Sequence, residues 1–127
     1  MQARPSGAGG CMSTAKESTV VLVTRAGMGD ADPELQEKLI KTWLKVVEAN
    51  GHLPEVVCFY ADGVKLALDG SPVLTELKRW EAVGVHLVLC KTCLDHFEAL
   101  DQVAVGVVGG MGDIVAAQLG ATKVISL

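Results

Sequence analysis

Short runs of apolar residues alternate along the chain with longer segments in which apolar and polar residues recur with a helical period. The runs carry Val, Leu and Ile at consecutive positions, which is typical of strands buried on both faces of a parallel sheet. They predict strands over residues 19–24, 54–60, 85–90, 103–108 and 123–127. Because helical segments separate these strands, we expect a three-layer α/β/α sandwich with about five mostly parallel strands.

Capping residues mark the ends of the two longest helical segments. Asp32 followed by Pro33 predicts an N-cap and a first helical residue, and Gly51 ends that helix. Ser71 and Pro72 predict the start of a second helix in the same way. The apolar positions that follow a 3.6-residue period in these helices are Leu35, Leu39, Ile40, Trp43, Leu44, Val46 and Val47, then Val73, Leu74, Leu77, Trp80 and Val83. Shorter helices are predicted over residues 64–68 and 113–119.

The strand predicted over residues 85–90 ends in a cysteine, and Cys93 follows three positions later. A helix that starts near Thr92 puts Cys90 at the carboxyl end of the strand and Cys93 in the first helical turn. Backbone N–H groups and the helix dipole favour a thiolate there, and Lys91 adds a positive charge. Because ligands of open α/β sheets bind outside the carboxyl ends of the strands, this stretch predicts a reactive-thiol site.

Other interpretations of these residues stay open. Free cysteines often only fill a core, and we expect this of Cys58 in the middle of a strand. His96 lies on the helical face of Cys93, but an ordinary surface histidine is the simpler interpretation. A zinc site would need two ligands besides the cysteine pair, and the sequence has no second C-x-x-C and no H-x-x-x-H motif to supply them. We therefore expect no metal ion and no cofactor.

The tetrapeptide Gly-Met-Gly-Asp occurs twice, each time between a predicted strand and a predicted helix. Its glycines are Gly27 and Gly29 in the first copy, and Gly110 and Gly112 in the second. Neither copy belongs to a dinucleotide-binding G-x-G-x-x-G motif or a P-loop, so a tight β–α turn is the favoured interpretation. Both loops are nevertheless expected at the carboxyl edge of the sheet beside the cysteines, where backbone amides are able to form a small-anion pocket.

Composition narrows the classes of function. The net charge of −4 offers no basic footprint for nucleic acid, and no apolar run reaches the ~18–20 residues of a membrane helix. The chain is 50% hydrophobic and 20% charged, so we expect a dense core or an apolar face buried between subunits. Four cysteines with one close pair are typical of free thiols in the cytoplasm. Small polar residues over 1–18 predict a disordered extension, which leaves 19–127 as a single domain.

Three blocks of sequence stand out, Asp62-Gly63-Val64-Lys65-Leu66-Ala67, Gly70-Ser71 and Cys90-x-Thr92-Cys93-Leu94-Asp95. They resemble the DsrE-like family, and most closely the carboxyl-terminal domain of YedF-type selenium-metabolism proteins, over residues 19–127. The resemblance implies a Rossmann- or flavodoxin-like fold, a homo-oligomer (a trimer favoured over a hexamer) and a role in intracellular sulfur handling. The sequence departs from the family pattern at Lys91, where Gly is usual, and at His96-Phe97-Glu98. No C-P-x-P carrier motif is present, so a partner carrier is expected to act in trans.

In the sulfur-carrier members of that family a cysteine after a central strand holds a persulfide, and Cys90 matches its position. We therefore expect a small sulfur-relay, sulfurtransferase-like protein in which Cys90 presents its sulfur at the sheet edge and Cys93 is the resolving thiol or a hydrogen-bond donor. The helix dipole taken alone favours Cys93 as the reactive thiol. The alternative is a non-enzymatic oligomeric binding or redox-sensing module whose C-x-T-C pair is structural. A small-molecule binder that uses the glycine loops ranks last. The residues expected to support the thiols are Lys91, Thr92, Asp95 and His96.

Overall fold

The computed structural model describes residues 18–127, and the predicted extension over 1–18, with Cys11, falls almost wholly outside them. The strands are β2 (Thr19–Val23), β3 (Val56–Phe59), β4 (His86–Cys90), β5 (Val107–Gly109) and β6 (Lys123–Ser126). All neighbouring strands pair in parallel, in the order β5-β4-β3-β2-β6. The first described strand, β2, therefore lies inside the sheet, with the last strand, β6, beside it.

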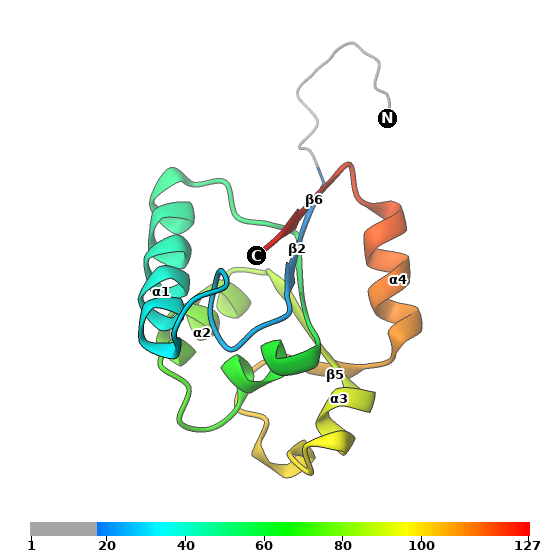
Figure 1. Cartoon of the computed structure of the whole chain (residues 1–127). Coiled ribbons are helices and arrows are strands. Elements are labelled where there is room, and N and C mark those ends of the chain that lie inside the picture. Colours follow the sequence, from blue (N-terminus) through cyan, green and yellow to red (C-terminus); the bar gives the residue numbers. More distant parts are fainter. Residues whose placement is uncertain (1–17) are drawn as a thin grey trace.

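Helices cover both faces of the sheet. They are α1 (Pro33–Asn50), α2 (Leu74–Ala82), α3 (Lys91–His96) and α4 (Met111–Gly120), with 3-10 helices η2 (Ala61–Ala67) and η3 (Leu100–Gln102). Figure 1 shows α1 and α2 on one face and α4 on the other, with α3 and η2 at the carboxyl end of the strands. The predicted α/β fold with a parallel sheet is confirmed. Within residues 18–127, no helix is long and apolar enough to cross a membrane.

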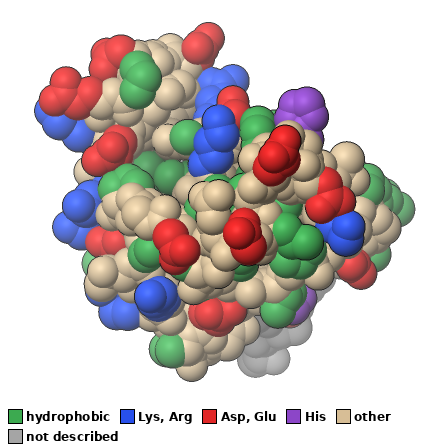
Figure 2. All heavy atoms as spheres, turned by 90° about the horizontal axis from the view of Figure 1, so that it is seen from below, with side chains coloured by type: hydrophobic (Ala, Val, Ile, Leu, Met, Phe, Trp, Pro, Cys, Tyr) green, Lys and Arg blue, Asp and Glu red, His purple; other side chains and the backbone are tan. Residues whose placement is uncertain are grey.

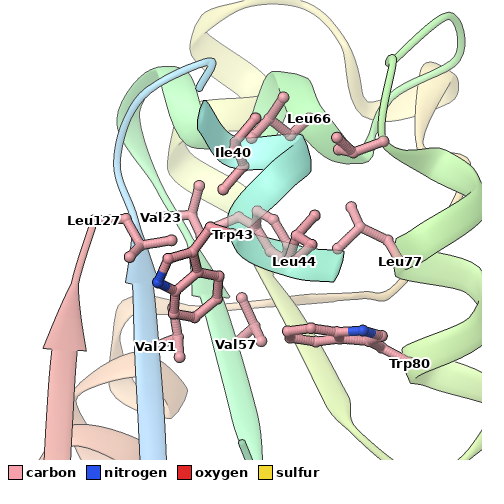
Figure 3. Close-up of a pocket in the computed structure, with 12 residues that line it drawn as sticks. Val21, Val23, Ile40, Trp43, Leu44, Val57, Leu66, Leu77, Trp80 and Leu127 are labelled. Carbon is pink, nitrogen blue, oxygen red and sulfur yellow. The ribbon is translucent and has the colours of Figure 1, made fainter. Parts of the chain in front are cut away.

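Alternation along the strands divides their side chains between the two faces. Val21 and Val57 are register partners and pack against α1 and α2 around a small internal cavity (Figure 3). The cavity measures about 10 Å³ and has an apolar lining, so it is a packing void rather than a ligand site. Cys58 and Val88, register partners one position further along, therefore point to the face that α4 covers.

The capping prediction for α1 is confirmed. Asp32 Oδ1 accepts a hydrogen bond from the Leu35 N–H at 3.1 Å, and Pro33 is the first helical residue. At the other end Gly51 adopts the left-handed conformation, with φ +76°, and its N–H donates to the Glu48 carbonyl at 3.1 Å. Both ends of this helix are thus fixed by residues that the sequence marks.

The apolar stripe of α1 is only partly buried. Ile40 and Leu44 are buried, and the half-buried Trp43 ring lies 6.3 Å from the Trp80 ring of α2, centroid to centroid. Val47 is partly buried against the core, so the apolar positions that follow the helical period do not all reach the interior. The exposed members of the two predicted stripes are Leu35, Leu39, Val46 and Val83.

Two other element boundaries differ from the prediction. α2 begins at Leu74 rather than Pro72, because Ser71 Oγ accepts a hydrogen bond from the Val73 N–H at 3.2 Å and forms a turn ahead of the helix. The short helix predicted next to it, over 64–68, is the 3-10 helix η2, which begins three residues earlier.

The start of β5 also differs, because Val107 and not Val103 begins the strand. Gly106 interrupts the extended run with φ +85°, a conformation that a residue with a side chain rarely adopts. Val103 takes part only in an isolated antiparallel bridge to Leu68. The strand is short as a result.

Candidate functional site

Cys90 and Cys93 lie at the carboxyl edge of the sheet, where β4 turns into α3. Cys90 is the last residue of β4 and the N-cap of α3, with an extended backbone (φ −69°, ψ 117°). Cys93 lies in the first turn of α3, and the register of the sheet pairs Cys90 with Gly109 of β5. The predicted strand-end and first-turn positions of the two cysteines are confirmed.

The two thiols differ in depth. Cys90 is 0% exposed and belongs to the hydrophobic core, whereas Cys93 is partly exposed. Alternation along β4 puts Cys90 on the same face as Val88, which α4 covers. The expectation that Cys90 presents its sulfur outward is therefore wrong, and within the pair it is Cys93 that solvent reaches.

The pKa of the Cys93 thiol lies above its ordinary value. Burial is the largest cause and the neighbouring Cys90 side chain adds to it, whereas the Ala61 N–H, 3.1 Å from Cys93 Sγ, opposes both. The predicted thiolate preference at the helix terminus is not met for Cys93, because burial raises its pKa by more than the Ala61 N–H lowers it. Burial also raises the pKa of Cys58, which lies in the core as expected.

The side chains predicted to support the thiols are mostly engaged elsewhere. Lys91 Nζ lies 2.7 Å from Asp95 Oδ2 one helical turn along α3, so its charge is compensated. Thr92 and His96 are exposed. The His96 ring stands edge-on against the Phe97 ring, with centroids 5.3 Å apart, which matches the interpretation of an ordinary surface histidine.

A contact that sequence reasoning missed joins η2 to the cysteine pair. Ala61, the first residue of η2, donates its N–H to Cys93 and has φ +52°, in the left-handed region. Lys65 of the same segment lies over the Phe97 ring, 4.6 Å from its centroid, and 3.0 Å from Asp62 Oδ1. The sequence marks a turn at Ala61-Asp62-Gly63, but nothing in it signals a left-handed alanine.

The two glycine loops do not form one pocket around the cysteines. The loop with Gly27 and Gly29 follows β2, and the loop with Gly110 and Gly112 follows β5, three strand spacings away, or about 14 Å. Only the second loop adjoins β4. The expectation of a shared anion pocket is therefore wrong, because the strand order keeps the loops apart.

Each glycine loop also uses its polar groups locally. Gln36 accepts a hydrogen bond from the Met28 N–H at 3.0 Å and donates one from Nε2 to the Gly29 carbonyl at 2.7 Å. Asp113 Oδ2 accepts from the Gly110 N–H at 3.0 Å and caps α4, which begins at Met111 and not at residue 113 as predicted. Both loops are tight β–α turns.

Figure 2 looks onto the carboxyl edge of the sheet and shows acidic and hydrophobic side chains interspersed over it. Within residues 18–127, no group of three or more His, Cys, Asp or Glu side chains is arranged to hold a metal ion. What the edge does provide is a buried thiol, Cys90, and three residues later a more accessible one, Cys93, whose sulfur accepts a hydrogen bond from a backbone amide. This arrangement is suited to thiol–disulfide exchange.

Comparison with known proteins gives a family and a fold. The sequence pattern of the DsrE/DsrF-like family matches residues 40–127. No curated protein matches the chain significantly.

Several solved structures share the fold. The YchN protein from E. coli has a TM-score of 0.66 at 21% identity, over 87% of this chain and 99% of its own. MTH1491 from Methanobacterium thermoautotrophicum, a protein of unknown function, has a TM-score of 0.65 at 20% identity, over 88% and 100% of the two chains. BT1422 from Bacteroides thetaiotaomicron, likewise of unknown function, has a TM-score of 0.64 at 17% identity, over 87% and 95%.

Proposed function

The chain belongs to the DsrE/DsrF-like family, which is generally associated with sulfur relay, and we propose from this that it carries sulfane sulfur as a persulfide on Cys93. The observation that supports the proposal most is the difference in depth within the cysteine pair: a partly exposed thiol at the sheet edge is backed by a buried one. The Cys90-x-Thr92-Cys93 block further supports kinship with YedF-type carboxyl-terminal domains within the family.

The proposed loading step exchanges one S–S bond for another. The Cys93 thiolate attacks the outer sulfur of a donor persulfide, R–S–SH, and the bond between the two donor sulfurs breaks. Cys93–S–SH forms and R–S⁻ leaves, so atoms and charge balance without an external oxidant or reductant. An acceptor thiolate on a partner carrier then repeats the exchange and regenerates the Cys93 thiolate.

Cys90 acts in this proposal as the resolving thiol. When no acceptor is present, the Cys90 thiolate attacks the inner sulfur of Cys93–S–SH, forms a Cys90–Cys93 disulfide and releases HS⁻. The placement of the two residues supports this role, since Cys93 lies three positions after Cys90, in the first turn of the helix that Cys90 caps, a separation at which two thiols can close a disulfide. The roles are thus the reverse of those expected from the sequence.

The proposal includes self-association as a trimer. The outward side of α4 carries apolar side chains four residues apart, Met111, Val115 and Leu119, and they are 49%, 41% and 83% exposed. A row of this kind is typical of a helix face that another subunit covers. The trimer, as distinct from other oligomers, rests on the family resemblance.

Intact-mass analysis tests the sulfur-carrier role. The full chain is incubated with glutathione persulfide, and we expect a mass gain of one sulfur atom. Cys93→Ser should abolish the gain, whereas Cys90→Ser should retain it and lengthen the adduct's lifetime, because the resolving attack is lost. Cys58→Ser is the matched control, since it removes another buried thiol and should change neither the adduct nor its lifetime.

Two outcomes would contradict the assignment. Loading that survives in Cys93→Ser and disappears in Cys90→Ser would return the carrier role to Cys90. If the wild-type chain gains no sulfur but forms an internal disulfide with oxidised glutathione, the cysteine pair serves a redox-sensing module instead.

A further inference from the structure

We propose that the backbone amide of Ala61 holds the Cys93 sulfur in place for attack and stabilises negative charge on it. The inference rests on the proposed function in taking Cys93 as the reacting thiol. The amide would act on the sulfur anion as the N–H donors of an oxyanion hole act on a developing oxyanion. In both cases the hydrogen-bond donor is held in position before the negative charge forms.

The contact joins distant parts of the chain. The Ala61 N–H donates to Cys93 Sγ at 3.1 Å, across 32 residues of sequence and between η2 and α3. A neutral thiol accepts hydrogen bonds weakly, whereas a bond to an ionised acceptor is roughly twice as strong as a neutral one. The hydrogen bond from the Ala61 N–H is therefore strongest when Cys93 is a thiolate or an anionic persulfide.

The backbone around Ala61 is held in the conformation that aims this N–H. The Tyr60 N–H donates to the Val23 carbonyl at 3.1 Å, and the Gly63 N–H donates to the Tyr60 carbonyl at 2.9 Å. A Cβ at Gly63 would collide with the Val23 carbonyl, so η2 lies directly against the end of β2 at that point. Ala61, between these two anchors, takes the disfavoured left-handed conformation.

The other groups around the sulfur do not replace the amide. Burial and the Cys90 side chain both raise the pKa of Cys93, and only the Ala61 N–H lowers it among these influences. The cationic side chains of η2 and α3 are already paired with carboxylates, and His96 is exposed. The pairs are Lys65 with Asp62 and Lys91 with Asp95.

A single-atom substitution tests the inference in the full chain. Nonsense suppression with lactic acid at position 61 replaces the Ala61 N–H by an ester oxygen and keeps the methyl group. Iodoacetamide alkylation of Cys93, followed by peptide mass spectrometry over a pH series, should then be at least about tenfold slower at neutral pH. Above the pKa of Cys93 the rates should converge with wild type, because thiolate formation is then complete; a merely structural defect would not give this pattern. The same ester at Ala104, whose N–H bonds the Ala67 carbonyl, is the control and should leave the profile unchanged.

A pair of ordinary variants decides the question if the ester protein does not fold. Ala61→Gly keeps the N–H and tolerates positive φ, so its pH profile should match wild type. Ala61→Val keeps the N–H chemically, but a β-branched residue resists positive φ, so its profile should move to higher pH. Coincident profiles for the ester or for valine, or the same shift in the Ala104 ester, would overturn the inference. The alkylation profile does not measure sulfur loading. A failed loading assay would therefore contradict the sulfur-carrier role without contradicting the role of the Ala61 amide.

Discussion

Gly63 shows how one absent side chain sets up the site. A Cβ there would overlap the Val23 carbonyl, so one of the two backbone segments would have to shift. Gly63→Ala should lower the free energy of unfolding by about 1–3 kcal/mol, as overpacking does. Gly112→Ala is the matched control, because its Cβ meets open space in a helix and should stabilise the chain by about 0.5–1 kcal/mol. Urea unfolding measures both, and equal midpoints for the two variants would contradict the packing account.

The reactivity of Cys93 should rise steeply with pH. Its pKa is raised, so the thiolate fraction at neutral pH is below that of an ordinary cysteine, and both alkylation and sulfur loading should be slow there. Rates measured by peptide mass spectrometry from about pH 6 to pH 10 should keep increasing beyond the range in which a free thiol levels off. A rate that is already constant below pH 7 would show a thiolate and refute the direction of the pKa change.

For single residues, the sequence predicts where the two thiols lie along β4 and α3, but it does not predict which of them is buried. A C-x-x-C motif sets the separation of Cys90 and Cys93 along the chain, and the strand-to-helix pattern places them at the sheet edge. Alternation also shows that Cys90 shares a face with Val88. Whether that face is covered depends on where α4, which begins only at Met111, packs against the sheet, and the local pattern around the cysteines does not contain this information.

At the level of elements, α1 and α2 are joined by a surface ion pair. Arg79 donates from Nε and from its terminal nitrogen to the two Glu48 oxygens, at 3.0 and 2.7 Å. These hydrogen bonds are the main cause of a lowered pKa for Glu48. A carboxyl group whose folded-state pKa is depressed contributes stability above its unfolded pKa and loses that contribution as pH falls through the folded pKa.

Arg79→Met should therefore lower the urea midpoint at pH 7 and leave it close to wild type near pH 2. Methionine keeps much of the apolar stem, so the change isolates the charge. Lys78→Met, next to it on α2 and exposed, is the control and should have little effect at either pH. An equal loss at both pH values would mean that packing of the stem, and not the ion pair, links the helices.

Elements were predictable where their own residues fix them. The N-cap at Asp32 and the left-handed Gly51 bound α1, and the runs of consecutive apolar residues locate the strands. α2 and β5 were displaced by turns whose geometry depends on one hydrogen bond or one dihedral angle. The predicted short helix α3 places Cys93 correctly. The thiolate expected there is not favoured, because burial raises the pKa of Cys93.

For the whole molecule, the proposed assembly leads to a test on α4. Leu119 is 83% exposed, so Leu119→Asp should leave the fold intact while it disrupts a subunit interface. Sedimentation velocity at micromolar concentration should show a trimer for wild type and smaller species for the variant. Val83→Asp, also exposed but at the end of α2, is the control and should stay trimeric. A wild-type monomer would rule out the assembly.

The fold as a whole was predictable from the alternation of strands and helices, because buried parallel strands need helices on both faces. The strand order was not, and it is what decides that the loop after β2 lies away from Cys90 while the loop after β5 adjoins it. Which loops become neighbours is decided by the crossover connections between the strands. A single sequence carries no local signal for the path of these connections.

On the proposed roles of the two thiols, the difference in depth between Cys90 and Cys93 leads to an expectation for the response to peroxide. A solution oxidant meets Cys93 first and converts it to a sulfenic acid, while Cys90 stays shielded in the core. The buried thiol then condenses with the sulfenic acid, water leaves, and a disulfide forms that ordinary cellular thiols can reduce. Capture by a thiol only three residues away should keep Cys93 from further oxidation to irreversible sulfinic acid, so the same burial that makes Cys90 a poor entry point makes it a safeguard for its neighbour.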